Sequence, residues 1–486
     1  MKVENSKAFI WSTLNNLSKL FFSFLAPILL ARILGPESFG IIAMAFVLVG
    51  LSQIFVDFGS TEAIVKSKHI TTKFLSSLFW FNLLISILVF SAILLLTPFV
   101  GAYFQKPELL IIVPLLSLGM FFQVWSIVPT SIFKRDKDFK SITVCDVISR
   151  FISSILAIGS ALMGAEIYSL ILLSLSQTII FCILINLLST SKVSWYFSLR
   201  YLRLVFSFTV SLFTVKVINH VERQADRFFI GPSYGEASLG IFTRGQAFQK
   251  SIQRFINGSF NPVFFSVITR QNTIDNLTSS LSKSYQGFFV IMYPLFLYFF
   301  FFSEELVLFL FGREWESMID LLPYFSFLFL IRPFQKVNQE VIIAKGNIYF
   351  LLACFLFYTP FLITIYFFMP DSLGLFGYIA GYIFISLLLF ITTTIYLKFM
   401  LNLKSSFFFK LFQVFFMRSF VLFLVAYYIE ALLSVSDFYF LNLTIFGLAL
   451  ILIMTLMQKL QHIEAQSDLE DILFKKPIKY LKSKQN

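Results

Sequence analysis

The chain of 486 residues is 58% hydrophobic and only 13% charged, and it contains 67 phenylalanines. A soluble domain cannot bury so many apolar side chains, so the composition excludes a soluble protein and indicates an integral membrane protein. The three cysteines, Cys145, Cys182 and Cys354, show no paired spacing. They support neither a disulfide framework nor a metal site.

Fourteen stretches of the sequence are long and apolar enough to cross a bilayer, which takes about 20 residues of helix. A membrane barrel would show alternating segments of about 10 residues, whereas these stretches are continuous, so they predict helices and an all-α polytopic membrane protein. In chain order they are 8–34, 39–62, 74–100, 109–130, 142–164, 167–189, 204–230, 239–264, 284–310, 319–344, 347–369, 374–397, 410–433 and 438–458. The first is too long for a signal peptide, and we expect it to be retained.

Lysine and arginine gather in the loops on one side of the predicted membrane. With a cytoplasmic N-terminus, the inner loops receive most cations, such as Lys66 and Lys134, and the outer loops receive carboxylates, such as Glu108 and Glu166. By the positive-inside rule, both termini are expected in the cytoplasm. The net charge of +12 then reflects topology and attraction to anionic lipid, and it does not imply nucleic acid.

A weak internal repeat divides the chain. RILGP at 32–36 and FGI at 39–41 are followed about 200 residues later by RFFIGP at 227–232 and LGI at 239–241. Six helices separate the copies, so both have the same orientation in the membrane. We therefore predict a six-helix lobe at 1–190, a cytoplasmic linker at 191–203, a second six-helix lobe at 204–400, two appended helices at 401–459 and a cytoplasmic tail at 460–486.

Three of the apolar stretches carry polar residues at i, i+3/i+4 and i+7, the spacing that places side chains on one face of a helix. By lobe symmetry, the first and seventh stretches should face each other across a cavity. The stripes are Ser12, Asn16, Lys19 and Ser23; Lys216, His220, Arg223 and Arg227; and Thr243, Gln246, Lys250, Gln253 and Asn257.

Three short motifs resemble the second-lobe signature of bacterial polysaccharide exporters, which belong to the multidrug, oligosaccharidyl-lipid and polysaccharide exporter superfamily. They are GP at 231–232, ASLGIFTR at 237–244 and NPVFF at 261–265. The resemblance spans essentially the whole chain. It implies a flippase in the bacterial cytoplasmic membrane that moves an undecaprenyl-diphosphate-linked oligosaccharide repeat unit from the inner to the outer leaflet by alternating access. The product would be O-antigen or a capsule, and polysaccharide polymerase machinery would be a partner.

Seven cations lie well inside the predicted helices, and facing lipid they would together cost on the order of 20 kcal/mol. Arg223 has Asp226, and Lys336 has Glu340, within one helical turn. Lys216 has no carboxylate at that spacing, nor do Lys19, Lys250 and Arg254. These cations therefore predict a hydrated, positively charged cavity that would suit a diphosphate, unless the side chains merely pair across helices.

The amides of the stripes suit sugar hydroxyls. The predicted substrate-binding residues are Asn16, Lys19, Lys216, His220, Arg223, Gln246, Lys250, Gln253, Arg254, Arg332 and Lys336.

Intramembrane carboxylates are candidates for coupling transport to H⁺ or Na⁺. We expect Asp57 or Glu222 to serve, whereas Asp146 more simply forms an ion pair with Arg150, one turn away. No other cofactor is expected.

Two other functions remain open from the sequence. One is an ion-coupled drug antiporter of the same superfamily, although its usual plan has twelve helices and a cationic cavity would repel cationic drugs. The other is a membrane polysaccharide polymerase, but the chain shows no large outer loop, nucleophile constellation or Gly-rich phosphate loop. An enzyme is therefore not expected.

Overall fold

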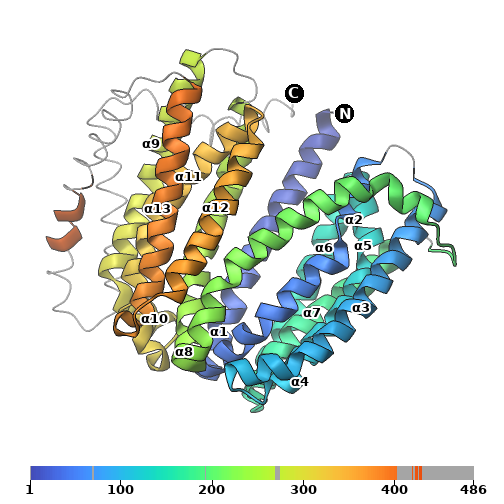
Figure 1. The fold of residues 1–486 in the computed structure, drawn as a ribbon, viewed down its shortest axis with the longest axis horizontal. Helices are drawn as coiled ribbons and strands as arrows, with labels where there is room; N and C mark the ends of the chain where they lie inside the picture. Colours follow the sequence, from blue (N-terminus) through green and yellow to red (C-terminus); the bar gives the residue numbers. More distant parts are fainter. Residues whose placement is uncertain are drawn as a thin grey trace, which may run out of the picture. The chain divides into compact units, whose positions relative to one another are not determined.

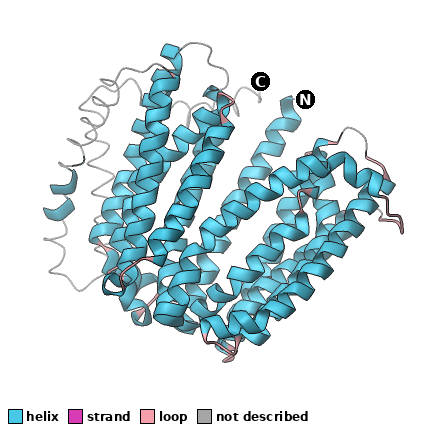
Figure 2. Cartoon of the chain, viewed as in Figure 1, coloured by secondary structure: helices cyan, strands magenta, loops and turns pink. Residues whose placement is uncertain are grey.

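The computed structural model describes residues 2–67, 70–191, 193–268 and 274–401, together with a few positions between 419 and 428. Within these ranges the regular structure is helical (Figure 2). The two predicted appended helices lie almost entirely outside the described residues, and the tail at 460–486 lies outside them completely.

The described helices follow the predicted apolar stretches closely (Figure 1). In chain order they are α1 (Lys2–Asp57), α2 (Ser60–Lys66), α3 (Thr72–Phe104), α4 (Leu109–Ser117), α5 (Gly119–Arg135), α6 (Phe139–Leu162), α7 (Glu166–Leu188), α8 (Leu199–Ile268), α9 (Ile274–Phe301), α10 (Ser303–Leu310), α11 (Leu322–Ala344), α12 (Ile348–Phe367) and α13 (Gly374–Met400), with the 3₁₀ turns η1 (Arg313–Met318) and η2 (Asp371–Leu373).

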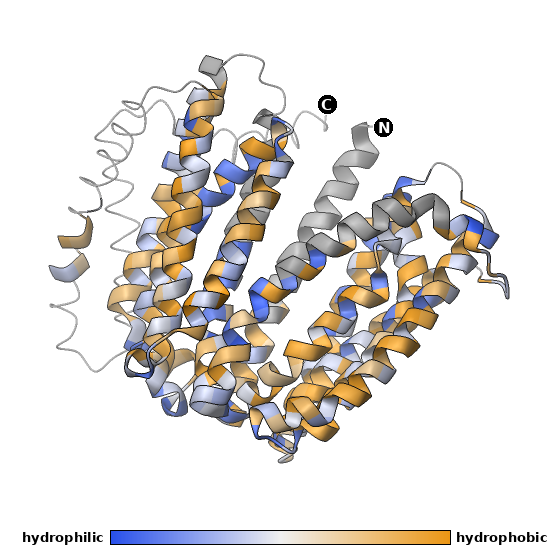
Figure 3. Cartoon of the chain, in the orientation of Figure 1, coloured by the Kyte–Doolittle hydropathy of each residue, from blue (hydrophilic) through white to orange (hydrophobic). Residues whose placement is uncertain are grey.

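Among the described residues, eight helical stretches are long and apolar enough to cross a membrane. Their outer faces carry large apolar side chains, as on α3, where Leu95 is 74% and Phe99 is 72% exposed. Figure 3 shows this helix coloured largely as hydrophobic. The prediction of an all-α polytopic membrane protein is confirmed, while the total of fourteen spans stays a prediction.

Two compact units make up the chain, Met1–Ser251 (unit 1) and Ile252–Asn486 (unit 2). The division falls inside α8. The sequence predicts lobes that are separated by a linker at 191–203, and these lobe limits stay a prediction. In unit 1, α6 packs on α1 and α7. In unit 2, α11 packs on α9 and α13, and a buried polar network joins these three helices through Tyr285, Asn338 and Thr394.

The two longest helices are each broken at a glycine in the left-handed region. Gly35 in α1 has φ 66° and Gly235 in α8 has φ 80°. A residue with a side chain would be strained there, so glycine permits each chain reversal into a second helical segment. The sequence aligns GP at 35–36 with GP at 231–232, whereas the structure makes Gly235 the geometric equivalent of Gly35.

The two breaks bring the repeats together within unit 1. A Cβ on Gly40 would lie 1.8 Å from the carbonyl oxygen of Glu236, and one on Gly240 would lie 1.9 Å from that of Pro36. The two contacts are reciprocal, because each glycine meets a carbonyl of the other repeat and the equivalent positions, 36 with 236 and 40 with 240, differ by 200. Such reciprocal contacts indicate a local two-fold relation. Only glycine allows the backbones this close, so both repeats depend on it at this crossing.

Beyond the crossing, each part of α1 packs on the opposite part of α8. Phe55 contacts Phe213 with ring centroids 4.8 Å apart, and Phe24 stacks on Phe248 at 5.1 Å. The sequence predicts that the first and seventh apolar stretches face each other. The described contacts place the seventh stretch, the first part of α8, against the second part of α1, and the facing of the first and seventh stretches across a cavity stays a prediction.

Candidate functional site

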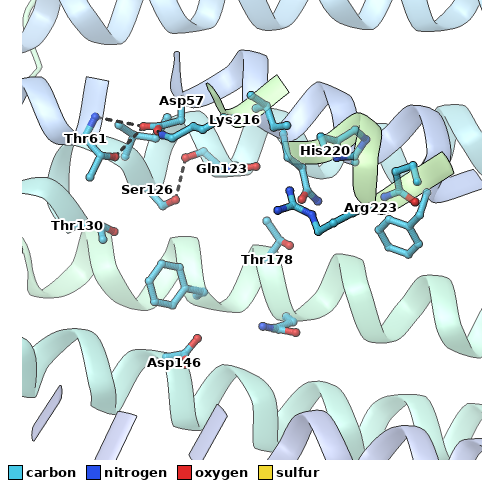
Figure 4. A pocket seen from close by; sticks show the side chains of 18 residues that line it. Asp57, Thr61, Gln123, Ser126, Thr130, Asp146, Thr178, Lys216, His220 and Arg223 are labelled. Atoms are coloured by element: carbon cyan, nitrogen blue, oxygen red, sulfur yellow. Dashed lines mark hydrogen bonds and ion pairs between the residues drawn. The ribbon is translucent and has the colours of Figure 1, made fainter. Parts of the chain in front are cut away.

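A cavity of about 690 Å³ lies inside unit 1 (Figure 4). Six helices contribute to its lining, which combines charged, amide and hydroxyl side chains with a few apolar ones. The lining residues are Phe46, Gly50, Gln53, Ile54 and Asp57 of α1; Thr61 of α2; Gln123, Ser126, Ile127 and Thr130 of α5; Asp146 of α6; Gln177, Thr178 and Phe181 of α7; and Lys216, His220, Arg223 and Gln224 of α8.

Asp57 is the last residue of α1, at a sharp break before α2, and its carboxylate links the helices of one wall of the cavity. Phe58 and Gly59 both have positive φ, 39° and 78°, and α2 begins at Ser60. One carboxylate oxygen of Asp57 accepts hydrogen bonds from the backbone N–H of Thr61 at 3.1 Å and from its hydroxyl at 2.7 Å. The other oxygen is left free to face α8.

Lys216 of α8 fills that position. Its ammonium nitrogen lies 2.7 Å from Asp57 Oδ2 and 3.0 Å from Glu62 Oε1. The inference from the sequence that Lys216 is an uncompensated cation is therefore wrong. Both carboxylates lie more than 150 residues away along the chain, so the helical spacing rule did not reveal them.

The opposite wall contains a second ion pair, which the sequence predicts correctly. Arg150 Nε donates to Asp146 Oδ2 at 3.0 Å. In the amide orientation that satisfies both groups, the oxygen of Gln177 accepts from the same guanidinium at 3.0 and 3.3 Å. In the view of Figure 4, Asp146 lies across the cavity from Asp57 and Lys216.

The charges of the lining are balanced. Asp57 and Asp146 contribute two carboxylates, and Lys216 and Arg223 contribute two permanent cations. The buried ring of His220 approaches the carbonyl oxygen of Val47 at 3.4 Å. This cavity thus lacks the excess of positive charge that the sequence predicts for a central cavity.

Two polar atoms of the lining are buried without a hydrogen-bond partner among the described residues. They are Thr130 Oγ1 on α5 and Gln224 Oε1 on α8. A buried polar atom left unpaired destabilises the fold, so such atoms mark a place where a ligand or water completes the bonding.

The other predicted site residues of unit 1 lie outside this lining. Gln246 donates to Asp226 Oδ2 at 2.7 Å, which links the two parts of α8. Glu222 also lies on α8. Lys250 makes contacts of its own. Asn16 and Lys19 lie in the part of α1 whose side chains are outside the described set.

The remaining predicted site residues belong to unit 2. Gln253 donates to the carbonyl oxygen of Leu328 at 2.8 Å, and the Arg332 guanidinium lies 4.2 Å from the ring centre of Tyr382. Lys336 pairs with Glu340 at 2.8 Å, as its spacing predicts. Arg254 also makes contacts.

The sequence reasoning missed the contribution of α5 and α7. Gln123, Ser126 and Thr130 recur at i, i+3 and i+7 on α5, and Gln177 and Thr178 lie together on α7. The α5 residues follow the same spacing as the stripes on α8. They were overlooked because they carry no charge and stand among apolar neighbours, although their period was a usable signal.

Solved structures with the same fold are membrane transporters. Over 92% of this chain and 97% of the other, the structure matches the lipid II flippase MurJ in an inward closed conformation, with a TM-score of 0.68 and 15% identity. Over 81% and 98%, it matches an inward-facing multidrug resistance MATE family transporter of the MOP superfamily, with a TM-score of 0.62 and 16% identity. These likenesses establish the fold.

Sequence relatives come from polysaccharide biosynthesis in several bacteria. The chain is 24% identical over 311 residues to the succinoglycan biosynthesis transport protein ExoT of Rhizobium meliloti (strain 1021), covering 63% of this chain and 62% of the relative. It is 22% identical over 312 residues to the teichuronic acid biosynthesis protein TuaB of Bacillus subtilis (strain 168), covering 61% and 62%. It is 21% identical over 337 residues to the lipopolysaccharide biosynthesis protein WzxC of Escherichia coli (strain K12), covering 66% and 65%.

Each of these matches spans less than two thirds of the relative's length. The family profile described as polysaccharide biosynthesis protein matches residues 29–320, which include all of the cavity lining and the crossing of α1 and α8. The resemblance noted in the motifs is thereby confirmed. On this match, the chain belongs to the polysaccharide biosynthesis protein family.

Proposed function

We propose that this protein is a flippase that moves an undecaprenyl-diphosphate-linked oligosaccharide from the inner to the outer leaflet of the bacterial cytoplasmic membrane by alternating access. The observation that carries the proposal is a polar cavity of about 690 Å³ among apolar helices long enough to span a bilayer. Family membership and a relative named as a transport protein support it. In this proposal the protein is a carrier without enzymatic activity, it works beside the polysaccharide polymerase machinery, and both termini are cytoplasmic.

Polar contacts divide the proposed substrate-binding residues into two groups. Lys216 is held by Asp57 and Glu62, so its charge is already compensated. Lys250 of unit 1 and Arg332 of unit 2 are each proposed to contact phosphate, since a guanidinium or ammonium binds phosphate oxygens strongly. Asn16, Lys19 and Arg254 are proposed for the same task, and so is Lys336, although Glu340 compensates its charge as Asp57 and Glu62 compensate that of Lys216.

Asp57 is the proposed coupling residue, with Glu222 as the second choice. An incoming H⁺ or Na⁺ would compete with Lys216 for Asp57 Oδ2, which Lys216 now approaches at 2.7 Å. Since the other oxygen of Asp57 holds the start of α2, losing the ion pair would loosen α8 from the break between α1 and α2. Ion binding is thereby tied to movement of a helix.

A drug antiporter of the same superfamily is the alternative. The balanced charges of the lining remove the electrostatic objection to a cationic drug in this cavity. The two functions differ in what a cell accumulates when the protein is deleted: a lipid-linked saccharide for the flippase, a cationic dye for the antiporter.

The proposal is tested by expressing the protein in its host after deletion of the native copy. The wild-type chain should restore surface polysaccharide and remove the accumulated lipid-linked precursor. Lys250→Ala should lower surface polymer severalfold and restore the accumulation, because a phosphate contact is lost, whereas Lys250→Arg should retain more export. Lys216→Ala should also impair export, because it leaves Asp57 and Glu62 without their counter-ion.

Abundance in the membrane, measured by immunoblot, serves as the control for folding. Unchanged surface polymer and unchanged precursor in the deletion strain would show that this protein does not carry the saccharide. Normal export by both alanine variants at wild-type abundance would remove Lys250 and Lys216 from the mechanism.

A further inference from the structure

The lining of the unit 1 cavity is rich in neutral hydrogen-bonding side chains. Four glutamines, Gln53, Gln123, Gln177 and Gln224, and four hydroxyl residues, Thr61, Ser126, Thr130 and Thr178, reach it from five helices. Amides and hydroxyls both donate and accept, so together they suit a ligand whose own groups do the same. A ring of sugar hydroxyls has that character, and a phosphate, which only accepts, does not.

Three of the four permanently charged side chains of the lining, Asp57, Asp146 and Lys216, are engaged in ion pairs. Lys216 lies between Asp57 and Glu62, and Asp146 pairs with Arg150. An anion entering the cavity would meet two carboxylates as well as two cations. The balance therefore disfavours a diphosphate here and leaves the neutral groups to determine what binds.

Two unpaired atoms indicate where a ligand would be held. Thr130 Oγ1 on α5 and Gln224 Oε1 on α8 are buried and have no partner among the described residues. The same cavity offers apolar surface from Phe46, Ile54 and Phe181, which suits the C–H faces of a sugar ring. Its volume of about 690 Å³ lies within the range of small-molecule sites, about 300–1,000 Å³.

We propose that this cavity binds the saccharide part of the lipid-linked substrate, while the diphosphate binds outside it. The proposal rests on the flippase function above and adds a specific site for the sugar. Thr130 and Gln224 are its specificity-determining residues, since both line the cavity and their side-chain oxygens have no partner among the described residues that would compete with the sugar.

Thr130→Val and Gln224→Met test the proposal with little disturbance of the fold. Each replaces the side chain by one of similar size. The oxygen that is removed has no hydrogen-bond partner among the described residues, so no such bond of that atom is lost. Removing an unpaired buried oxygen should leave the melting temperature unchanged or raise it. The matched control is Thr97→Val on α3, a buried threonine outside the lining whose hydroxyl donates to the carbonyl oxygen of Ile93 at 2.7 Å.

The measurement is binding to the full-length protein in lipid nanodiscs. One probe is the polyprenyl-diphosphate-linked repeat unit extracted from a polymerase-deficient strain of the host, and the other is polyprenyl diphosphate without sugar. The wild type should bind the sugar-linked probe more tightly. Each variant should weaken that binding by about three- to tenfold, the effect of one hydrogen bond, and should bind the sugar-free probe like the wild type.

Each other outcome contradicts a defined part of the proposal. If both variants bind the sugar-linked probe as tightly as wild type and the Thr97→Val control, the cavity does not bind the saccharide, although the flippase function stands. Equal weakening for both probes would likewise overturn recognition of the sugar by these residues. If the wild type binds neither probe and does not restore export, the flippase function itself is wrong.

Discussion

At the scale of single residues, Gly40 and Gly240 determine how closely the repeats approach. The Cβ positions overlap backbone carbonyls at 1.8 and 1.9 Å, and backbone cannot move aside as a flexible side chain can. We expect Gly240→Ala to lower the free energy of unfolding by about 2–3 kcal/mol, because the helices must separate to admit the methyl group. Thermal unfolding of the purified protein in detergent measures the loss.

The matched control for this substitution is Gly159→Ala in α6, where a Cβ would meet nothing within 4 Å. Alanine is favoured over glycine inside a helix, so this variant should gain about 0.5–1 kcal/mol. Equal melting temperatures for the two variants would show that the crossing is not as tight as the structure has it.

The residues of the site were only partly predictable, and the reason is distance along the chain. Asp146 with Arg150 and Lys336 with Glu340 were inferred correctly because each pair spans one helical turn. The ion pair of Lys216 with Asp57 joins residues 159 positions apart. A contact between residues so far apart leaves no periodic pattern in the sequence. Helical spacing therefore gave no partner for Lys216, and the positive charge expected around it was too high.

At the scale of elements, hydrophobic length located the helices and also the breaks in α1 and α8. The predicted stretches end at 34 and 230 and resume at 39 and 239, and the glycines with positive φ, Gly35 and Gly235, lie inside these gaps. The repeated motifs FGI and LGI, 200 residues apart, contain the two glycines of the crossing, Gly40 and Gly240. The sequence does not show which parts of α1 and α8 pack together, because these contacts join residues far apart along the chain, on either side of the crossing.

An ion pair outside the spanning segments ties the end of α3 to this crossing. Lys106 donates to Glu236 Oε1, and Tyr103 donates to the carbonyl oxygen of Phe228 at 3.1 Å. The hydrogen bond with Glu236 raises the pKa of Lys106. Partial burial opposes ionisation of Glu236, but the hydrogen bond and the charge of Lys106, together with a backbone hydrogen bond, hold the Glu236 pKa below its ordinary value.

We therefore expect Glu236→Gln to cost up to about 1 kcal/mol at neutral pH, a small value because the pair is partly exposed to solvent. Since the folded pKa of Glu236 is depressed, its contribution is present above the unfolded value of about 4.3 and disappears as the pH falls through the folded value. Melting temperatures of wild type and variant should converge at acid pH and in high salt. A difference that persists under both conditions would mean that the amide disturbs the crossing by another route.

At the scale of the whole molecule, composition alone was sufficient for the class. A chain that is 58% hydrophobic has to place apolar side chains against lipid, and α3 does so with Leu95 and Phe99. The compact units divide inside α8, which runs from one unit into the other. The predicted lobes, with a linker at 191–203, stay a prediction, because a boundary inside a helix leaves no break in apolar periodicity.

Orientation in the membrane gives a prediction that involves the whole chain. The loop after α3 and the loop after α6 should lie outside the cell, and the loop after α5 inside, because cations such as Lys134 and Arg135 gather there. The native cysteines are buried, so single new cysteines can report the side. Glu108→Cys and Met163→Cys should react with a membrane-impermeant maleimide in intact cells.

Asp136→Cys, on the inner side, should react only after the cells are permeabilised. All three positions are exposed to solvent, so a failure to react cannot be ascribed to burial inside the protein. The opposite labelling pattern would invert the topology. It would place the basic loops outside, against the cost of moving several lysines and arginines across the membrane potential, and it would reverse the leaflet from which the substrate enters.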